Sequence, residues 1–186
     1  WLYLFLIPAV GMRLWAEERR GGTIELLLTL PVTVWQAVLG KYLAALVFTG
    51  IALGLTFPMW LSVNYLGDPD NGVIAAGYVG SLLMAGAFLS IGSCLSAVTR
   101  NQVIAFVLTA VVCLAFVLSG FPLVLQFFSG WAPDFVMSIV SSFSFLSHFQ
   151  SITKGVIDVR DVIYFVSLIA FWLFANVAII EWKKAA

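Results

Sequence analysis

Residues Met12–Lys41, MRLWAEERRGGTIELLLTLPVTVWQAVLGK, form a polar segment between two long apolar runs. The chain has nine basic and nine acidic residues, and this segment holds seven of them: Arg13, Glu17, Glu18, Arg19, Arg20, Glu25 and Lys41. Gly21 and Gly22 are expected to end a helix here, since glycine costs about 1 kcal/mol relative to alanine in a helix interior. We call residues 17–33 the elbow.

The elbow is expected to contain a short second helix. Thr23 is a plausible N-cap, and Glu25 would place a negative charge in the first turn, where it complements the helix dipole. Residues 24–30 would form this helix and Pro31 would end it. A Leu-Leu-Leu face on such a helix is an exposed apolar patch unless a partner covers it. We therefore favour a docking surface over a solvated loop.

The composition is that of a membrane protein. The 186 residues are 62% hydrophobic and only 10% charged, with a mean hydropathy of +1.08, whereas soluble domains are about 25% charged. Apolar runs longer than about 18 residues recur, as in membrane-spanning helices. A formal net charge of zero gives no support for a nucleic-acid partner.

The predicted fold is an all-α integral membrane protein with about five visible spans, the first of them partial. We expect one transmembrane domain over residues 1–186, in which residues 1–16 end a span that starts upstream. The other predicted spans are 34–66, kinked at Pro58, then 73–98, 102–125 and 162–181. Residues 126–161, rich in aromatics, are expected to form an outer interfacial or re-entrant segment.

Basic residues set the expected orientation. If the elbow faces the cytoplasm, Lys154 and Arg160 face out and the other seven basic residues face in, which satisfies the positive-inside rule. The C-terminus would then be cytoplasmic. Small residues at helical spacing follow two lines, Gly77, Ser81, Ala85 and Gly86, Ser90, Cys94, and are expected to pack within the subunit rather than at a dimer seam.

Few residues have side chains suited to catalysis, ion transport or ligand binding. No predicted span holds a charged residue deep in its apolar run, so ion-coupled transport is not favoured. The chain has no phosphate-binding loop of the G-x-x-x-x-G-K-[ST] type. The lone His148 is expected to have a structural, hydrogen-bonding role, with Asp134 and Asp158 as the first carboxylates before and after it in sequence. Cys94 and Cys113 lie in apolar runs, against a disulfide or zinc site. No catalytic, cofactor-binding or metal-binding residue is predicted.

Three tracts carry a family resemblance: Met12–Lys41, Ser96-Ala-Val-Thr-Arg-Asn-Gln102, and the stretch from Leu146-Ser-His-Phe-Gln to Asp-Val-Ile-Tyr164. The chain resembles type-2 ATP-binding-cassette (ABC) transporter permeases, specifically the gliding-motility (GldF-like) branch. The resemblance implies a six-span permease of the bacterial inner membrane that dimerises with a second permease subunit. It also implies an ABC ATPase subunit as partner, with ATP and Mg held by that partner.

The resemblance also assigns roles to residues. The elbow would contain the coupling helix that contacts the ATPase, with Glu17, Glu18, Arg19, Arg20, Thr23, Glu25 and Leu26 as coupling residues. The outer segment would cap the exit and act as a gate, with Phe135, Phe143, Phe145, His148 and Phe149 as its candidate residues. An extracytoplasmic partner protein is left open.

Three functions are compatible with these features. The first is a permease subunit of an ATP-driven exporter or mechanical transducer. The second is a non-transporting anchor or assembly factor on the same fold, which would share the elbow with the first. The third is an intramembrane enzyme. Its only possible catalytic groups would be serines and one histidine, and the chain has no Gly-x-Ser-x-Gly motif.

Overall fold

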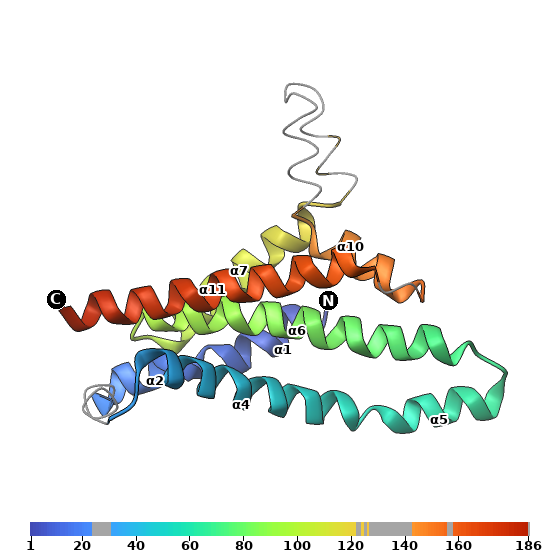
Figure 1. Ribbon diagram of the computed structural model, residues 1–186, viewed down its shortest axis with the longest axis horizontal. Coiled ribbons are helices and arrows are strands. Elements are labelled where there is room, and N and C mark those ends of the chain that lie inside the picture. Colours follow the sequence, from blue (N-terminus) through green and yellow to red (C-terminus); the bar gives the residue numbers. More distant parts are fainter. Residues whose placement is uncertain (24–30, 122–123, 125, 127–142, 156–157, 186) are drawn as a thin grey trace.

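The structure is a computed structural model that describes residues 1–23, 31–121, 124, 126, 143–155 and 158–185, with side chains as far as Lys183. Within these ranges every regular element is an α-helix (Figure 1). The helices are α1 (Tyr3–Gly11), α2 (Arg13–Gly21), α4 (Val34–Gly54), α5 (Phe57–Leu66), α6 (Asn71–Val98), α7 (Gln102–Leu118), α10 (Phe145–Thr153) and α11 (Val159–Ala185).

Local sequence signals account for several helix ends. Gly22 ends α2 in the left-handed conformation, with φ of 70°, as the predicted break requires. Thr33 and Gln36 form a capping box at the start of α4. Asp70 and Asn101 cap α6 and α7 by accepting backbone N–H groups. The predicted kink is confirmed as a break between α4 and α5, with Pro58 in the first turn of α5.

The lengths of the helices agree only in part with the predicted spans. Three stretches are long and apolar enough to cross a membrane: Val34–Leu66, Asn71–Val98 and Val159–Lys183. The shorter α7 ends at Leu118 instead of continuing unbroken to residue 125. The last helix begins at Val159, so Asp161, predicted in an outer loop, lies in its first turn.

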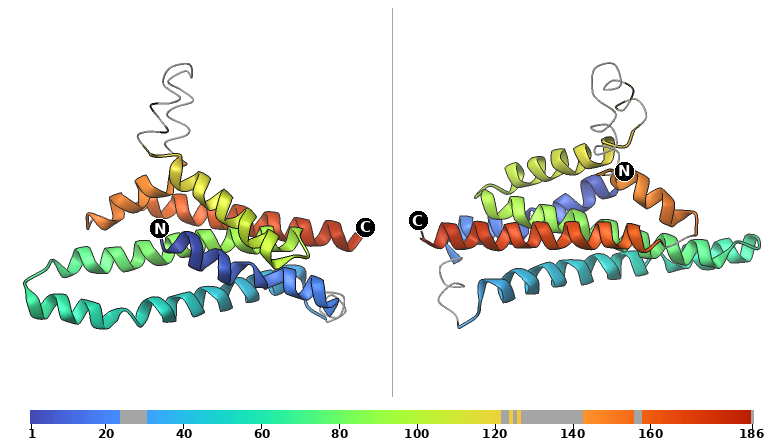
Figure 2. Two further views of the ribbon diagram at one scale, coloured as in Figure 1. Left: turned by 180° about the vertical axis from the view of Figure 1, so that it is seen from behind. Right: turned by 45° about the horizontal axis from the view of Figure 1, so that its top comes forward.

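Helix α6 is the centre of the bundle and packs against α1, α2, α4, α7, α10 and α11. Figures 1 and 2 show its C-terminal half running among the other helices, while α5 and the start of α6 project beyond them. Small residues permit the close approach. Gly92 meets Gly11 of α1, Gly86 lies against Tyr42 of α4, and Gly80 lies against Ile152 of α10.

The line Gly86, Ser90, Cys94 is fully buried inside the subunit, as predicted. The other line is mixed: Ala85 is buried, whereas Gly77 and Ser81 are only partly covered. Packing within one subunit therefore accounts for the small residues Gly86, Ser90 and Cys94, and for Ala85 at the end of the other line.

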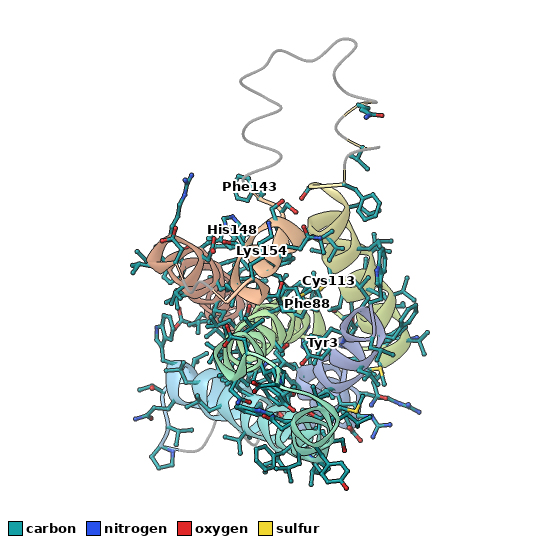
Figure 3. All side chains as sticks on the ribbon, turned by 90° about the vertical axis from the view of Figure 1, so that its right-hand side faces the viewer. Tyr3, Phe88, Cys113, Phe143, His148 and Lys154 are labelled. Atoms are coloured by element: carbon teal, nitrogen blue, oxygen red, sulfur yellow. The ribbon has the colours of Figure 1, made fainter. Side chains whose placement is uncertain are left out.

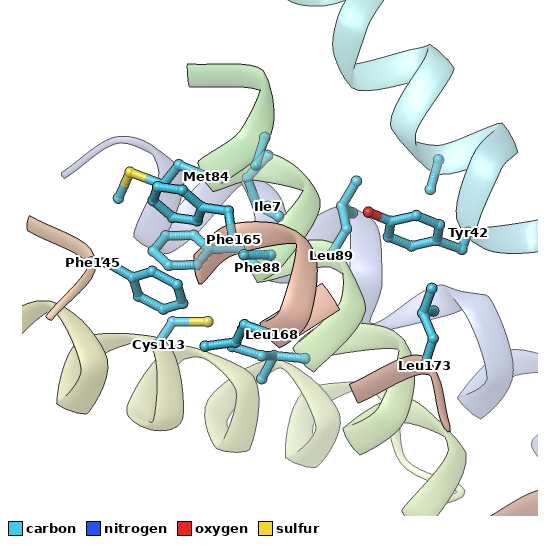
Figure 4. Close-up of a cluster of buried hydrophobic side chains, with 14 of the residues drawn as sticks. Ile7, Tyr42, Met84, Phe88, Leu89, Cys113, Phe145, Phe165, Leu168 and Leu173 are labelled. Carbon is cyan, nitrogen blue, oxygen red and sulfur yellow. The ribbon is translucent and has the colours of Figure 1, made fainter. Parts of the chain in front are cut away.

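The aromatic core joins four helices near the middle of the bundle (Figure 4). Phe145 of α10 meets Phe88 of α6 edge to face, with ring centroids 5.1 Å apart, and stacks on Phe165 of α11 at 5.8 Å. Cys113 of α7 is buried in the same cluster. Phe145 was predicted to belong to an outer gate, but it has no exposed surface and serves as a core residue.

The bundle has two ends that differ in charge. The elbow end comprises α2, the start of α4, the α6–α7 connector and the end of α11; the far end comprises α5, the start of α6, α10 and the start of α11 (Figure 1). Seven basic residues are on helices or connectors of the elbow end: Arg13, Arg19, Arg20, Lys41, Arg100, Lys183 and Lys184. Lys154 and Arg160 belong to the far end.

Candidate functional site: the anchored elbow

A serine hydroxyl of α6 forms hydrogen bonds with the backbone where α1 and α2 meet. Met12 links the two helices and provides no side-chain cap for α2. The Ser96 hydroxyl instead accepts the backbone N–H groups of Trp15 (3.1 Å) and Ala16 (2.9 Å) and donates to the Met12 carbonyl (2.8 Å). The first N–H groups of a helix have no internal partner. Ser96 therefore caps α2 from another helix and fixes its direction.

A buried polar cluster lies beside this joint. The Trp15 indole is fully buried and donates from Nε1 to the Ser93 hydroxyl at 3.2 Å. Asn176 of α11 donates to the same hydroxyl at 2.7 Å. The cluster links α2, α6 and α11, and polar side chains of this kind join helices across an apolar interior. Sequence reasoning missed Asn176 because it searched the spans only for charged residues.

Lys41 of α4 also contacts α2, so a second helix helps to fix its position. Its ammonium forms an ion pair with Glu18, donates to the Leu14 carbonyl at 2.7 Å and lies 4.4 Å from the centroid of the Trp15 ring. The pair is only partly exposed, so solvent screens it less than a surface pair. Lys41 therefore connects α4 to α2.

The C-terminus of α6 is covered by two basic side chains. Arg19 donates to the Ala97 carbonyl at 2.6 Å, and Lys183 donates to the Val98 carbonyl at 2.7 Å. Cations are favoured there because the last carbonyls of a helix carry partial negative charge. Burial, and secondarily the positive charge of Arg100, lower the pKa of the Arg19 guanidinium. The Arg19 side chain therefore makes its contacts mainly within the subunit.

The predicted coupling residues consequently divide into two groups. Glu18 and Arg19 turn toward α4 and α6, whereas Glu17, Arg20 and Thr23 are exposed. The Thr23 hydroxyl donates to the Glu18 carbonyl at 3.4 Å. Thr23 is the last described residue before residues 24–30. Its predicted role as the cap of a second helix, and the predicted coupling roles of Glu25 and Leu26, therefore fall outside the described residues. Of the predicted coupling residues on α2, Glu17 and Arg20 are thus the two that are open to a partner.

The far end holds an unexpected pair. His148 Nδ1 of α10 lies 2.6 Å from Asp161 Oδ1 of α11, and the imidazole stacks on Tyr164 with centroids 4.1 Å apart. The Tyr164 hydroxyl donates to the Phe143 carbonyl at 2.6 Å. The expected hydrogen-bonding role of His148 is present, and Asp161 is one of its partners. Figure 3, viewed from the far end, shows Phe143 and His148 on the same side of the bundle.

The remaining gate candidates differ in exposure. Phe143 is exposed, Phe149 is half-buried against α6 beside Gly80, and Phe135 lies outside the described residues. The described part of the predicted outer segment is thus a packed helix, α10, tied to α11 through His148.

We expect His148→Phe to destabilise the chain more than the double variant His148→Phe with Asp161→Leu. The single change keeps a ring over Tyr164 but leaves the Asp161 carboxylate, which is 7% exposed, without its partner. An unpaired buried charged group costs about 1–3 kcal/mol or more, whereas replacing both partners by apolar groups is often close to neutral. Thermal unfolding in detergent measures both. Additive losses in the double variant would contradict the pairing.

Two apolar cavities lie beside α1. One, of about 320 Å³, separates α1 from α4; the other, of about 440 Å³, lies among α1, α6, α7 and α10. Their linings include the hydroxyls of Tyr3, Thr49 and Ser81 but no charged side chain. Among the described residues no cluster of three His, Cys, Asp or Glu side chains could hold a metal ion.

Comparison with protein families identifies a match over nearly the whole chain. Residues 3–180 match the profile of a protein family described as ABC-2 family transporter protein. No curated protein matches the chain.

Proposed function

Since the match covers nearly its whole length, the chain belongs to the ABC-2 family of transporter membrane proteins, and we propose that it is the permease subunit of an ATP-driven exporter. The ATPase, which would hold ATP and Mg, would be a separate subunit or domain. The permease would pair with a second permease subunit and lie in the bacterial cytoplasmic membrane with its C-terminus inside. The excess of basic residues at the elbow end supports that orientation.

The observation that carries the proposal is the anchoring of α2. Ser96, Lys41 and Arg19 join it to α6 and α4 from different sides. A force applied to the exposed face of α2 would therefore move the central helix rather than bend a loose loop. A permease driven by an external ATPase needs such a stiff connection. Coupled elements of this kind transmit motion because packed interfaces shift as units.

The same division of residues suggests how docking works. Glu17 and Arg20 offer charges of both signs on the exposed face of α2, and Glu25 and Leu26 follow five and six positions after Arg20. We assign these residues to ATPase contact, and Glu18 and Arg19 to transmission of the movement. Complementary charges at the rim of an interface mainly set specificity and association rate.

Two finer assignments complete the proposal. The tract Leu146–Tyr164 supports placement near the gliding-motility (GldF-like) branch. The docking of α10 through His148 and Asp161 supports a role for the outer segment as a closed cap over the far end. Export and mechanical work both require the same connection through α2.

The test is co-purification of the full chain with the ABC ATPases of its cell, identified by mass spectrometry. We expect Glu17→Lys with Arg20→Glu to reduce recovery of an ATPase at least about tenfold, since each like-charge contact opposes docking. The matched control reverses two exposed charges at the far end, Asp68→Lys with Lys154→Glu, and should retain the ATPase.

Two outcomes would contradict the proposal. Equal recovery with the elbow variant and the control would place the docking surface elsewhere. If folded wild-type protein brings down no ABC ATPase, the permease assignment fails and the non-transporting anchor is the better account.

A further inference from the structure

Three cations gather where α6 ends. Arg19 and Lys183 share one acceptor, the Ala97 carbonyl, at 2.6 and 3.3 Å. Arg100 follows Val98 by two residues in the α6–α7 connector, close enough for its charge to act on both Arg19 and Lys183. We call Arg19, Arg100 and Lys183 the basic cluster. It joins α2, the connector and α11 at the elbow end.

Within the described part of the chain, no carboxylate forms an ion pair with the basic cluster. Glu18 is committed to Lys41, and Glu17 and Glu181 are exposed and form no ion pair with the cluster. The partial negative charge at the end of a helix is equivalent to only about half an elementary charge. Three full positive charges therefore remain under-compensated, and Arg100 has no side-chain hydrogen-bond partner among the described residues.

The surroundings of the cluster are those of a membrane interface. Val98 beside it is 43% exposed, Val103 at the start of α7 is 67% exposed, and Trp182 is 74% exposed. Tryptophan is enriched at the headgroup level of membranes. A ligand at the cluster would thus meet cations at one end and apolar side chains along its flank. A soluble acidic protein would satisfy the cations but would leave these apolar side chains uncovered.

We propose that the basic cluster binds the phosphate of an anionic phospholipid, whose acyl chains lie along Val98 and the exposed apolar side chains of α7. Arginine suits this role because its planar fork can donate two hydrogen bonds to one phosphate. Arg100 would make the principal contact, while Arg19 and Lys183 would contribute charge from behind it. A lipid here would sit beside the anchored end of α2. The assignment does not depend on the identity of the ATPase partner.

The test is native mass spectrometry of the full chain in neutral detergent, titrated with phosphatidylglycerol or phosphatidylcholine. We expect wild type to prefer phosphatidylglycerol and Arg100→Gln to lose about fivefold in affinity, the typical contribution of one basic residue near a membrane surface. Arg100 makes no contact that folding requires, so this variant tests binding and not stability. Lys154→Gln, at the far end, is the matched control and should bind as wild type.

Four results would overturn the proposal. The first is equal binding of the two lipids by wild type, and the second is unchanged phosphatidylglycerol binding by Arg100→Gln. The third is displacement of the lipid by inorganic phosphate at equal concentration, which would assign the cluster to a free phosphate instead of a headgroup. A preference lost only with Lys154→Gln would place the lipid at the far end and would equally exclude the cluster.

Discussion

Ser96→Ala is expected to lower the free energy of unfolding by about 3 kcal/mol and to uncouple α2 from α6. The change removes one hydroxyl that serves two backbone N–H groups, those of Trp15 and Ala16, and the Met12 carbonyl. Leaving a buried polar group without a partner costs about 1–3 kcal/mol. Thermal unfolding of the purified chain in detergent, followed by helical circular dichroism, measures the loss.

Ser90→Ala is the matched control for this prediction. Ser90 is equally buried on α6, but its hydroxyl donates only to the Ala87 carbonyl of its own helix, at 2.8 Å. Its removal strands no group on another helix, so the expected effect is below about 1 kcal/mol. Similar melting temperatures for the two variants would mean that Ser96 does not cap α2.

Gly11→Val is expected to force α1 away from α6 and to destabilise the chain by at least about 1–3 kcal/mol, the usual cost of overpacking. A Cβ atom at Gly11 would lie 3.2 Å from Gly92 Cα, which is a backbone atom and cannot rotate aside. The contact is immediately before the α1–α2 joint. The variant should therefore also weaken ATPase recovery, since α2 would lose its position on α6.

Gly77→Val is the control for steric cost. Gly77 lies on the same central helix, and no neighbouring atom is within 4 Å of the position that its Cβ would take. Helix propensity alone favours replacing glycine in a helix interior by several tenths of a kcal/mol. We expect this variant to melt at or slightly above the wild-type temperature. Destabilisation as large as that of Gly11→Val would show that the close approach of α1 and α6 is not the cause.

The sequence was a good guide to local features of this fold. The helix end at Gly22 and the break before Pro58 each depend on residues within a few positions of one another. Their chemistry is therefore visible in the sequence itself. The elbow was recognisable for the same reason, because a charged run interrupts apolar runs.

The connections that define the candidate site were not predictable in this way. Ser96 meets Trp15 and Ser93 meets Asn176 across about 80 residues of sequence. A serine or asparagine in an apolar helix gives the same pattern whether it faces lipid or another helix. His148 and Asp161 are closer in sequence, but the helix start at Val159 had to be known before Asp161 could be placed beside α10.

The central claim is that the exposed face of α2 contacts an ABC ATPase. It is tested most directly by placing a photo-crosslinking amino acid at position 17 or 20 in the full chain, with position 154 at the far end as control, and illuminating intact cells. The account predicts crosslinks from positions 17 and 20 to an ABC ATPase, identified by mass spectrometry, and none from position 154. Crosslinks from positions 17 and 20 only to lipid or to proteins other than an ABC ATPase would contradict it.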